Sequence, residues 1–158
     1  MGAMEIFDQT IEDLWQLHSP DKVVHYLQKL AQETQDTTDV DRWMLVHLHL
    51  VRAYTMQLDL ARSEKLLKKV VDRLIPKMHR YRTLCYIEKG RILMACSDAD
   101  RGLGCWERAE KIALKNNLMD LADEAARLKN LYRELVVDTK EFTYSDMKSY
   151  VKQSLLIR

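Results

Sequence analysis

Hydrophobic residues recur three and four positions apart in almost every window of this chain. That spacing is typical of amphipathic α-helices, because it places apolar side chains on one face of the helix. Strands would need alternating polarity and frequent turns, yet the 158 residues include only 4 Gly and 2 Pro. The pattern therefore predicts an all-α protein of about eight helices. The predicted helices span residues 4–17, 20–33, 42–58, 60–75, 79–96, 101–114, 118–137 and 145–156.

Capping residues and prolines indicate several of the helix boundaries. Ser19 is a good N-cap for the second helix, and the proline that follows it is tolerated in the first helical turn. Asp39 or Asp41 would cap the third helix, and Pro76 would end the fourth. The connections are short, which favours antiparallel neighbours.

Part of this pattern repeats along the chain at a spacing of 39 residues. The residues Leu50, Tyr54, Ser63, Leu67 and Val70 correspond in this way to Lys89, Leu93, Gly102, Trp106 and Ala109. Four of these five pairs keep their size class. Such a period predicts stacked helical hairpins, in which no hairpin covers its own apolar face. Apolar residues surround the helix at 42–58, so we expect it to be central.

The hairpin at 50–70 resembles a tetratricopeptide repeat in its order of large apolar, aromatic, small, large apolar and small apolar residues, closed by Pro76. The second copy adds Gly90, where this family has a small residue early in the first helix. The resemblance covers about residues 42–115, with a longer period than the usual ~34 residues, a lysine at 89 and Val51 as departures. It implies a right-handed array of antiparallel hairpins, a tetratricopeptide-like solenoid.

The resemblance also implies an inner groove lined by the first helix of each hairpin. Carrying the repeat register over gives candidate partner-binding residues at Arg52, Arg91, Asn130 and Met56. Side-chain donors in a row would suit the carboxylates of an extended or helical peptide. The alternative is that the arginines form intramolecular salt bridges, for example with Glu88 or Glu134. The carboxylate-clamp pattern of the family is not reproduced, so a receptor for chaperone tails is not implied.

Charge is unevenly distributed behind a net charge of +1. Residues 1–41 contain nine acids and two lysines, whereas residues 42–117 contain sixteen Lys or Arg and eight acids. Lys65, Lys69 and Arg73 belong to the densest basic run, which we interpret as a solvated outer helix face. The alternative is a nucleic-acid surface. A third hypothesis is a homodimer in which the acidic first hairpin of one copy contacts the basic centre of another.

Signatures of catalysis or of cofactor binding are not evident in the sequence. It contains no GxSxG, GxGxxG or GxxxxGK motif. His47 and His49 are two residues apart and would lie on different helix faces, unlike helical metal ligands. Gly102 and Gly104 are better explained by close helix packing. We therefore expect neither an enzyme, nor a cofactor, nor a metal site.

The cysteines Cys85, Cys96 and Cys105 form no CxxC pair, so we interpret them as buried thiols in a reducing compartment. Residues 1–3 resemble a cloning scar, and residues 4–158 are predicted to form one helical-repeat domain. No membrane span or secretory signal is visible. We expect an intracellular, cytoplasmic protein, with the nucleus as an alternative.

These observations favour a non-catalytic adaptor or scaffold subunit within a multi-subunit complex. In this hypothesis the inner groove binds a peptide or a partner protein. The alternative is a nucleic-acid-associated helical repeat that uses the basic middle third of the chain.

Overall fold

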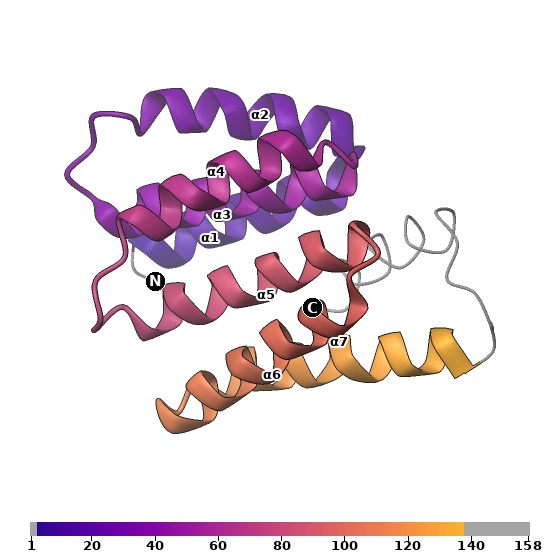
Figure 1. The fold of residues 1–158 in the computed structure, drawn as a ribbon. Helices are drawn as coiled ribbons and strands as arrows, with labels where there is room; N and C mark the ends of the chain where they lie inside the picture. Colours follow the sequence, from indigo (N-terminus) through magenta and orange to yellow (C-terminus); the bar gives the residue numbers. More distant parts are fainter. Residues whose placement is uncertain (1–2, 138–158) are drawn as a thin grey trace.

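A computed structural model describes residues 3–137 of the chain, and the regular structure in this range is entirely helical (Figure 1). The helices are α1 (Ala3–Leu17), α2 (Pro20–Glu33), α3 (Val40–Met56), α4 (Leu60–Asp72), α5 (His79–Ala95), α6 (Ala99–Lys115) and α7 (Met119–Val137). The predicted all-α class is confirmed, and seven helices match predicted ones closely. The predicted helix at 145–156 lies outside the described residues, as do Met1 and Gly2.

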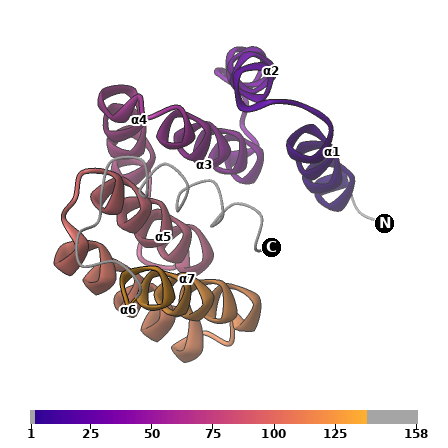
Figure 2. The same ribbon diagram turned by 90° about the vertical axis from the view of Figure 1, so that its right-hand side faces the viewer.

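Consecutive helices pack against each other from α1 to α7. In Figure 2, α1 and α2 lie at one end, α3, α4 and α5 follow, and α6 and α7 lie at the other end. None of the helices within residues 3–137 combines the length and apolar character required to cross a bilayer.

The predicted start of α2 is confirmed, whereas the predicted end of α4 needs correction. Ser19 is at the N-cap of α2, but its side chain makes no capping hydrogen bond. Pro20 removes one N–H from the first turn, so fewer donors there need a partner. Helix α4 ends at Asp72 rather than at residue 75, because the residue before Pro76 disfavours the helical conformation and Leu74 N–H bonds in a turn to the Val71 carbonyl at 3.0 Å.

The turns that connect α3 to α4 and α5 to α6 have the same construction. Leu58 and Ser97, which are 39 positions apart, have positive φ angles of 59° and 62°. The next residues, Asp59 and Asp98, are the N-caps of α4 and α6. Each carboxylate accepts a hydrogen bond from the backbone N–H of the arginine three residues later, at 3.3 Å and 3.4 Å. The period found in the sequence therefore extends to the turns.

Small residues lie where the backbones of paired helices come close to each other. Ser63 of α4 donates from its hydroxyl to the Val51 carbonyl of α3 at 2.9 Å. A Cβ atom added to Gly102 of α6 would lie 3.2 Å from the carbonyl oxygen of Gly90 in α5. These two contacts are equivalent, because both members are displaced by 39 residues. The close-packing prediction was wrong for Gly104, where an added Cβ would meet nothing within 4 Å.

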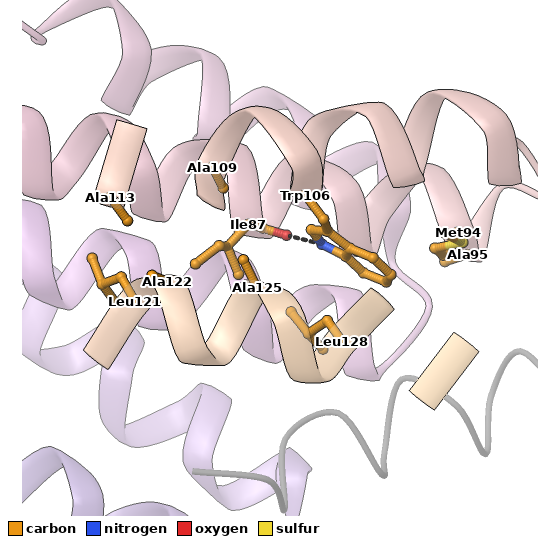
Figure 3. Packing of buried hydrophobic residues seen from close by; sticks show 10 residues of the cluster. All are labelled: Ile87, Met94, Ala95, Trp106, Ala109, Ala113, Leu121, Ala122, Ala125 and Leu128. Carbon is orange, nitrogen blue, oxygen red and sulfur yellow. Dashed lines mark hydrogen bonds between the residues drawn. The ribbon is translucent and has the colours of Figure 1, made fainter. Parts of the chain in front are cut away.

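Buried hydrophobic residues form three clusters, each joining three successive helices. One joins α1, α2 and α3 and contains Leu27, and the next joins α3, α4 and α5 and contains Met44. The third joins α5, α6 and α7 around Trp106 (Figure 3). Each cluster shares a helix with the next, as in repeat proteins that contact only their neighbours. The apolar circumference of α3 is explained in this way, because α3 contributes to two clusters.

Trp106 is fully buried and connects α6 to α5. Its indole N–H donates to the Ile87 carbonyl at 3.1 Å, as drawn in Figure 3. The ring lies against Gly90, where an added Cβ would be 2.5 Å from Trp106 Cδ1. The indole therefore occupies the space that a side chain at residue 90 would need.

The cysteines differ in exposure more than the sequence predicted. Cys85 is buried, and burial raises the pKa of its thiol to about 12. Cys105 is half-buried, and Cys96 at the end of α5 is exposed. The expectation of buried thiols is therefore right for Cys85 and wrong for Cys96, which lies past the last buried turn of α5.

Candidate functional site

Four helices enclose a hollow of about 380 Å³, here called the inner hollow. It is lined by Asp8, Glu12, Leu45, Leu48, His49, Arg52, Arg80, Tyr81, Leu84, Glu88, Asp120, Leu121, Glu124 and Arg127. All of these residues belong to α1, α3, α5 and α7, which are alternate helices along the chain.

The floor of the inner hollow is a buried ion network that joins α3, α5 and α7. Arg52 Nε donates to Glu88 Oε1 at 2.9 Å, and Arg52 Nη2 lies 2.8 Å from the same oxygen. Arg91 also bonds to Glu88 through Nη1, and it reaches Glu124 Oε1 through Nη2 at 2.9 Å. The Arg52, Glu88 and Arg91 side chains are 4%, 1% and 0% exposed.

In this network the two positive charges of the guanidinium groups balance the two negative charges of the carboxylates. Burial acts to raise the pKa of Glu124, but the nearby positive charges of Arg91 and then Arg52 outweigh it, so the pKa lies below its ordinary value. Glu124 therefore stays ionised at neutral pH. Charges removed from water this far are costly unless paired, and the pairing fixes the side chains in place.

His49 connects the network to α1. Trp15 N–H donates to His49 Nδ1 at 3.0 Å. Because indole nitrogen is only a donor, Nδ1 must carry the lone pair and the imidazole proton must be on Nε2. Burial, followed by the positive charges of Arg52 and Arg91, lowers the pKa of His49 well below 6.5. A neutral His49 thus fixes α1 against α3.

Charges at the rim of the inner hollow are arranged asymmetrically. On the α1 side, burial raises the pKa of both Asp8 and Glu12. Between α5 and α7, Arg80 forms a bidentate pair with Asp120, with N–O distances of 2.7 Å and 3.3 Å. The α7 side also contributes the exposed Arg127. The rim is therefore acidic along α1, whereas along α7 it carries Arg127 together with Asp120, which is paired with Arg80.

The predicted partner-binding residues lie in three different environments. Arg52 and Arg91 come together, but their heads pair with carboxylates of the protein itself, as the intramolecular alternative stated. Glu88 is the partner that was named correctly. Asn130 is exposed, and Met56 is half-buried against the cluster around Trp106. Neither belongs to the lining of the inner hollow.

Sequence reasoning missed Glu124 and the bond between Trp15 and His49. Glu124 is 33 residues from Arg91 and outside the repeat register, and Glu134, which was offered instead, is exposed. The one signal in the sequence for a salt-bridge network here was the i,i+3 spacing of Glu88 and Arg91 on one helix.

The predicted basic surface divides around α4. Lys69 and Arg73 line a separate hollow of about 500 Å³, in which the Arg73 guanidinium stacks 3.9 Å from the Trp43 ring centroid. Lys68, which belongs to the same basic run, faces another hollow, between α4 and α5. Lys65 is exposed. The basic run thus does not form one continuous strip.

The histidines of α3 have structural partners. His47 stacks on Trp43 with ring centroids 4.0 Å apart, and its Nδ1 lies 2.8 Å from the Trp43 carbonyl oxygen. Across residues 3–137, no set of three His, Cys, Asp or Glu side chains is arranged to hold a metal ion.

Comparisons of the chain with protein-family models, with curated proteins and with solved structures gave no match.

Proposed function

We propose that this protein is a non-catalytic interaction module, a right-handed tetratricopeptide-like array of antiparallel hairpins that acts as an adaptor or scaffold subunit. Its inner hollow binds a segment of a partner protein. The observation that carries this proposal is the lining of the hollow, which comes only from the alternate helices α1, α3, α5 and α7. That is the arrangement expected for the inner groove of such an array.

The floor of the inner hollow supports a role in recognition. Its charges are held in a paired network, so a partner would meet a pre-organised surface and lose little affinity to side-chain ordering.

The rim defines the charge of the segment that would fit. Asp8 favours a cationic side chain near α1, whereas Arg127 favours a carboxylate near α7. This differs from the row of three donors expected from the sequence. The partner segment in our proposal therefore has a basic end and an acidic end, in a fixed orientation across the hollow.

The test is affinity capture with variants of exposed rim residues. Charge reversal at Arg52 or Arg91 is unsuitable, because it would unbalance the buried network and unfold the protein. Asp8→Lys and Arg127→Glu change exposed side chains of the hollow, and Lys111→Glu changes an exposed lysine of α6 outside it. We expect both rim variants to lose a partner that the wild type and Lys111→Glu retain. Retention of every partner by the folded double rim variant would contradict the proposal.

A further inference from the structure

A second concave surface lies between α4 and α5 and encloses about 780 Å³. We call it the outer groove and define it by Glu64, Lys68, Val71, Ile75, Arg82 and Lys89, together with a buried floor. The floor includes Leu67 and Cys85, both buried.

The walls of the outer groove expose large apolar side chains. Val71 is 47% exposed and Ile75 is 42% exposed. They lie near each other at the end of α4, where Leu74 and Pro76 also line the groove. Clustered apolar exposure on a concave surface is a mark of an interaction site, whereas single exposed apolar residues are ordinary.

The outer groove and the inner hollow use different faces of α5. The inner hollow takes Leu84 and Glu88 from this helix, and the outer groove takes Cys85 and Lys89. Successive residues on a helix point about 100° apart, so the two surfaces lie on different faces of α5. A ligand of one does not occupy the other.

The register of the lining residues indicates the shape of the occupant. Helix α4 contributes Glu64, Lys68 and Val71, and α5 contributes Arg82 and Lys89 with residues 85 and 86 between them. Both helices therefore line the groove at three- and four-residue intervals over seven residues, or roughly 10 Å. Two such ridges form a trough that fits about two turns of a third helix.

The charges at the rim indicate the chemistry of the occupant. Lys68, Arg82 and Lys89 contribute three positive charges, and Glu64 contributes one negative charge. A helix with an apolar stripe and acidic flanks complements both the walls and the rim. Opposite charges of this kind fix the register and accelerate association.

Two other occupants fit less well. Residues 138–158 carry four basic and three acidic side chains, so their charge does not complement a basic rim. A second copy of the protein offers no suitable described helix: the exposed large apolar residues Leu17, Tyr26, Val40, Leu114 and Met119 each belong to a different helix. A docking helix needs several such residues on one face.

We propose that the outer groove is a second docking site, which takes an acidic amphipathic helix of another protein with apolar residues at positions i, i+3 or i+4, and i+7. With the inner hollow it gives the module two separate partner sites, one on each side of α5.

The test uses the full-length protein and a labelled synthetic helix of about 15 residues, with leucines at the stated spacing and glutamates at its flanks. A second peptide carries lysines in place of the glutamates. Fluorescence anisotropy measures binding of both peptides to the wild type and to Val71→Asp, Lys68→Glu and Lys89→Glu. Controls are Leu114→Asp, which changes an equally exposed apolar residue outside the groove, and Arg127→Glu in the inner hollow. Circular dichroism confirms that each variant folds.

We expect the acidic peptide to bind and Val71→Asp to weaken it about tenfold or more, as for a residue central to an interface. The two lysine variants should each weaken it several-fold, and Leu114→Asp and Arg127→Glu should leave it unchanged. Equal binding of the lysine peptide, or unchanged affinity in the groove variants, would overturn the proposal. Val151→Asp tests whether residues 138–158 compete for the groove, and tighter peptide binding by this variant would assign the groove to those residues instead. A dimer that Val71→Asp abolishes would assign the groove to a second copy of the protein.

Because Arg127→Glu alters only the inner hollow, the two proposals can fail independently. Loss of partners in the rim variants with no peptide binding would leave only the inner hollow. Peptide binding with no effect of the rim variants would leave only the outer groove.

Discussion

Gly90→Ala tests the packing of α5 on α6, on which the hairpin geometry depends. The added Cβ would lie 2.5 Å from Trp106 Cδ1 and 2.9 Å from Cε2, and closer still to Nε1. The indole is rigid and completely buried, so it must move as a unit by roughly 1 Å to restore ordinary contact distances. That movement also stretches its 3.1 Å hydrogen bond to the Ile87 carbonyl.

The expected cost follows from three contributions. Overpacking a core costs about 1–3 kcal/mol, and losing a buried hydrogen bond costs about 1–3 kcal/mol. Replacing glycine by alanine within a helix by itself raises the free energy of unfolding by about 1 kcal/mol. We therefore expect Gly90→Ala to lower the free energy of unfolding by about 3 kcal/mol.

Gly104→Ala is the matched control, because it is the same change in α6 at an exposed position with nothing within 4 Å. This variant should raise the free energy of unfolding by about 0.5–1 kcal/mol. Urea unfolding followed by circular dichroism measures both values. A Gly90→Ala variant as stable as Gly104→Ala would refute the close contact between Gly90 and Trp106.

Other changes probe the polar contacts. The pKa of His49 is lower in the folded protein than its ordinary 6.5, so stability should fall as pH drops below about 6.5, by up to about 1.4 kcal/mol per pH unit. His49→Gln should reduce this slope between pH 7.5 and 5.5, and an unchanged slope would contradict the lowered pKa of His49. Asp59→Ala and Asp98→Ala should each cost about 1 kcal/mol in urea unfolding, and clearly unequal losses would contradict the equivalence of the two turns. Glu88→Gln leaves two buried guanidinium groups undercompensated and should cost about 3–5 kcal/mol, whereas a loss under about 1 kcal/mol would mean that the network is hydrated.

Much of the fold could be predicted from the sequence because it depends on local periodicity. Apolar spacing located the helices, and the 39-residue repeat located Ser63 and Gly102 at close approaches between helices. Glycine spacing alone could not distinguish Gly102, which faces α5, from the exposed Gly104 two positions later. A shift of two residues turns a side chain by about 200° around a helix, so the register of α6 on its neighbour decides the difference.

The site was less predictable, because its chemistry depends on contacts between helices. The repeat placed Arg52 and Arg91 at equivalent positions, and the structure brings them to the same carboxylate. Which acids complete the network depends on where α7 lies, and Glu124 falls outside the repeat. The partition of the basic run also required the structure, since Lys68 and Lys69 are adjacent in sequence but line different hollows.

Site-specific photo-crosslinking tests the proposed use of the inner hollow most directly. A photoreactive residue in place of the partly exposed Leu45 lines the hollow and leaves both rim charges intact, and one in place of Lys111 lies on α6 outside it. In cells, we expect a discrete protein adduct at 45, absent at 111 and lost when Asp8→Lys is added. Adducts at 111 alone, or the same adduct at both positions regardless of Asp8, would contradict the proposed use of the hollow.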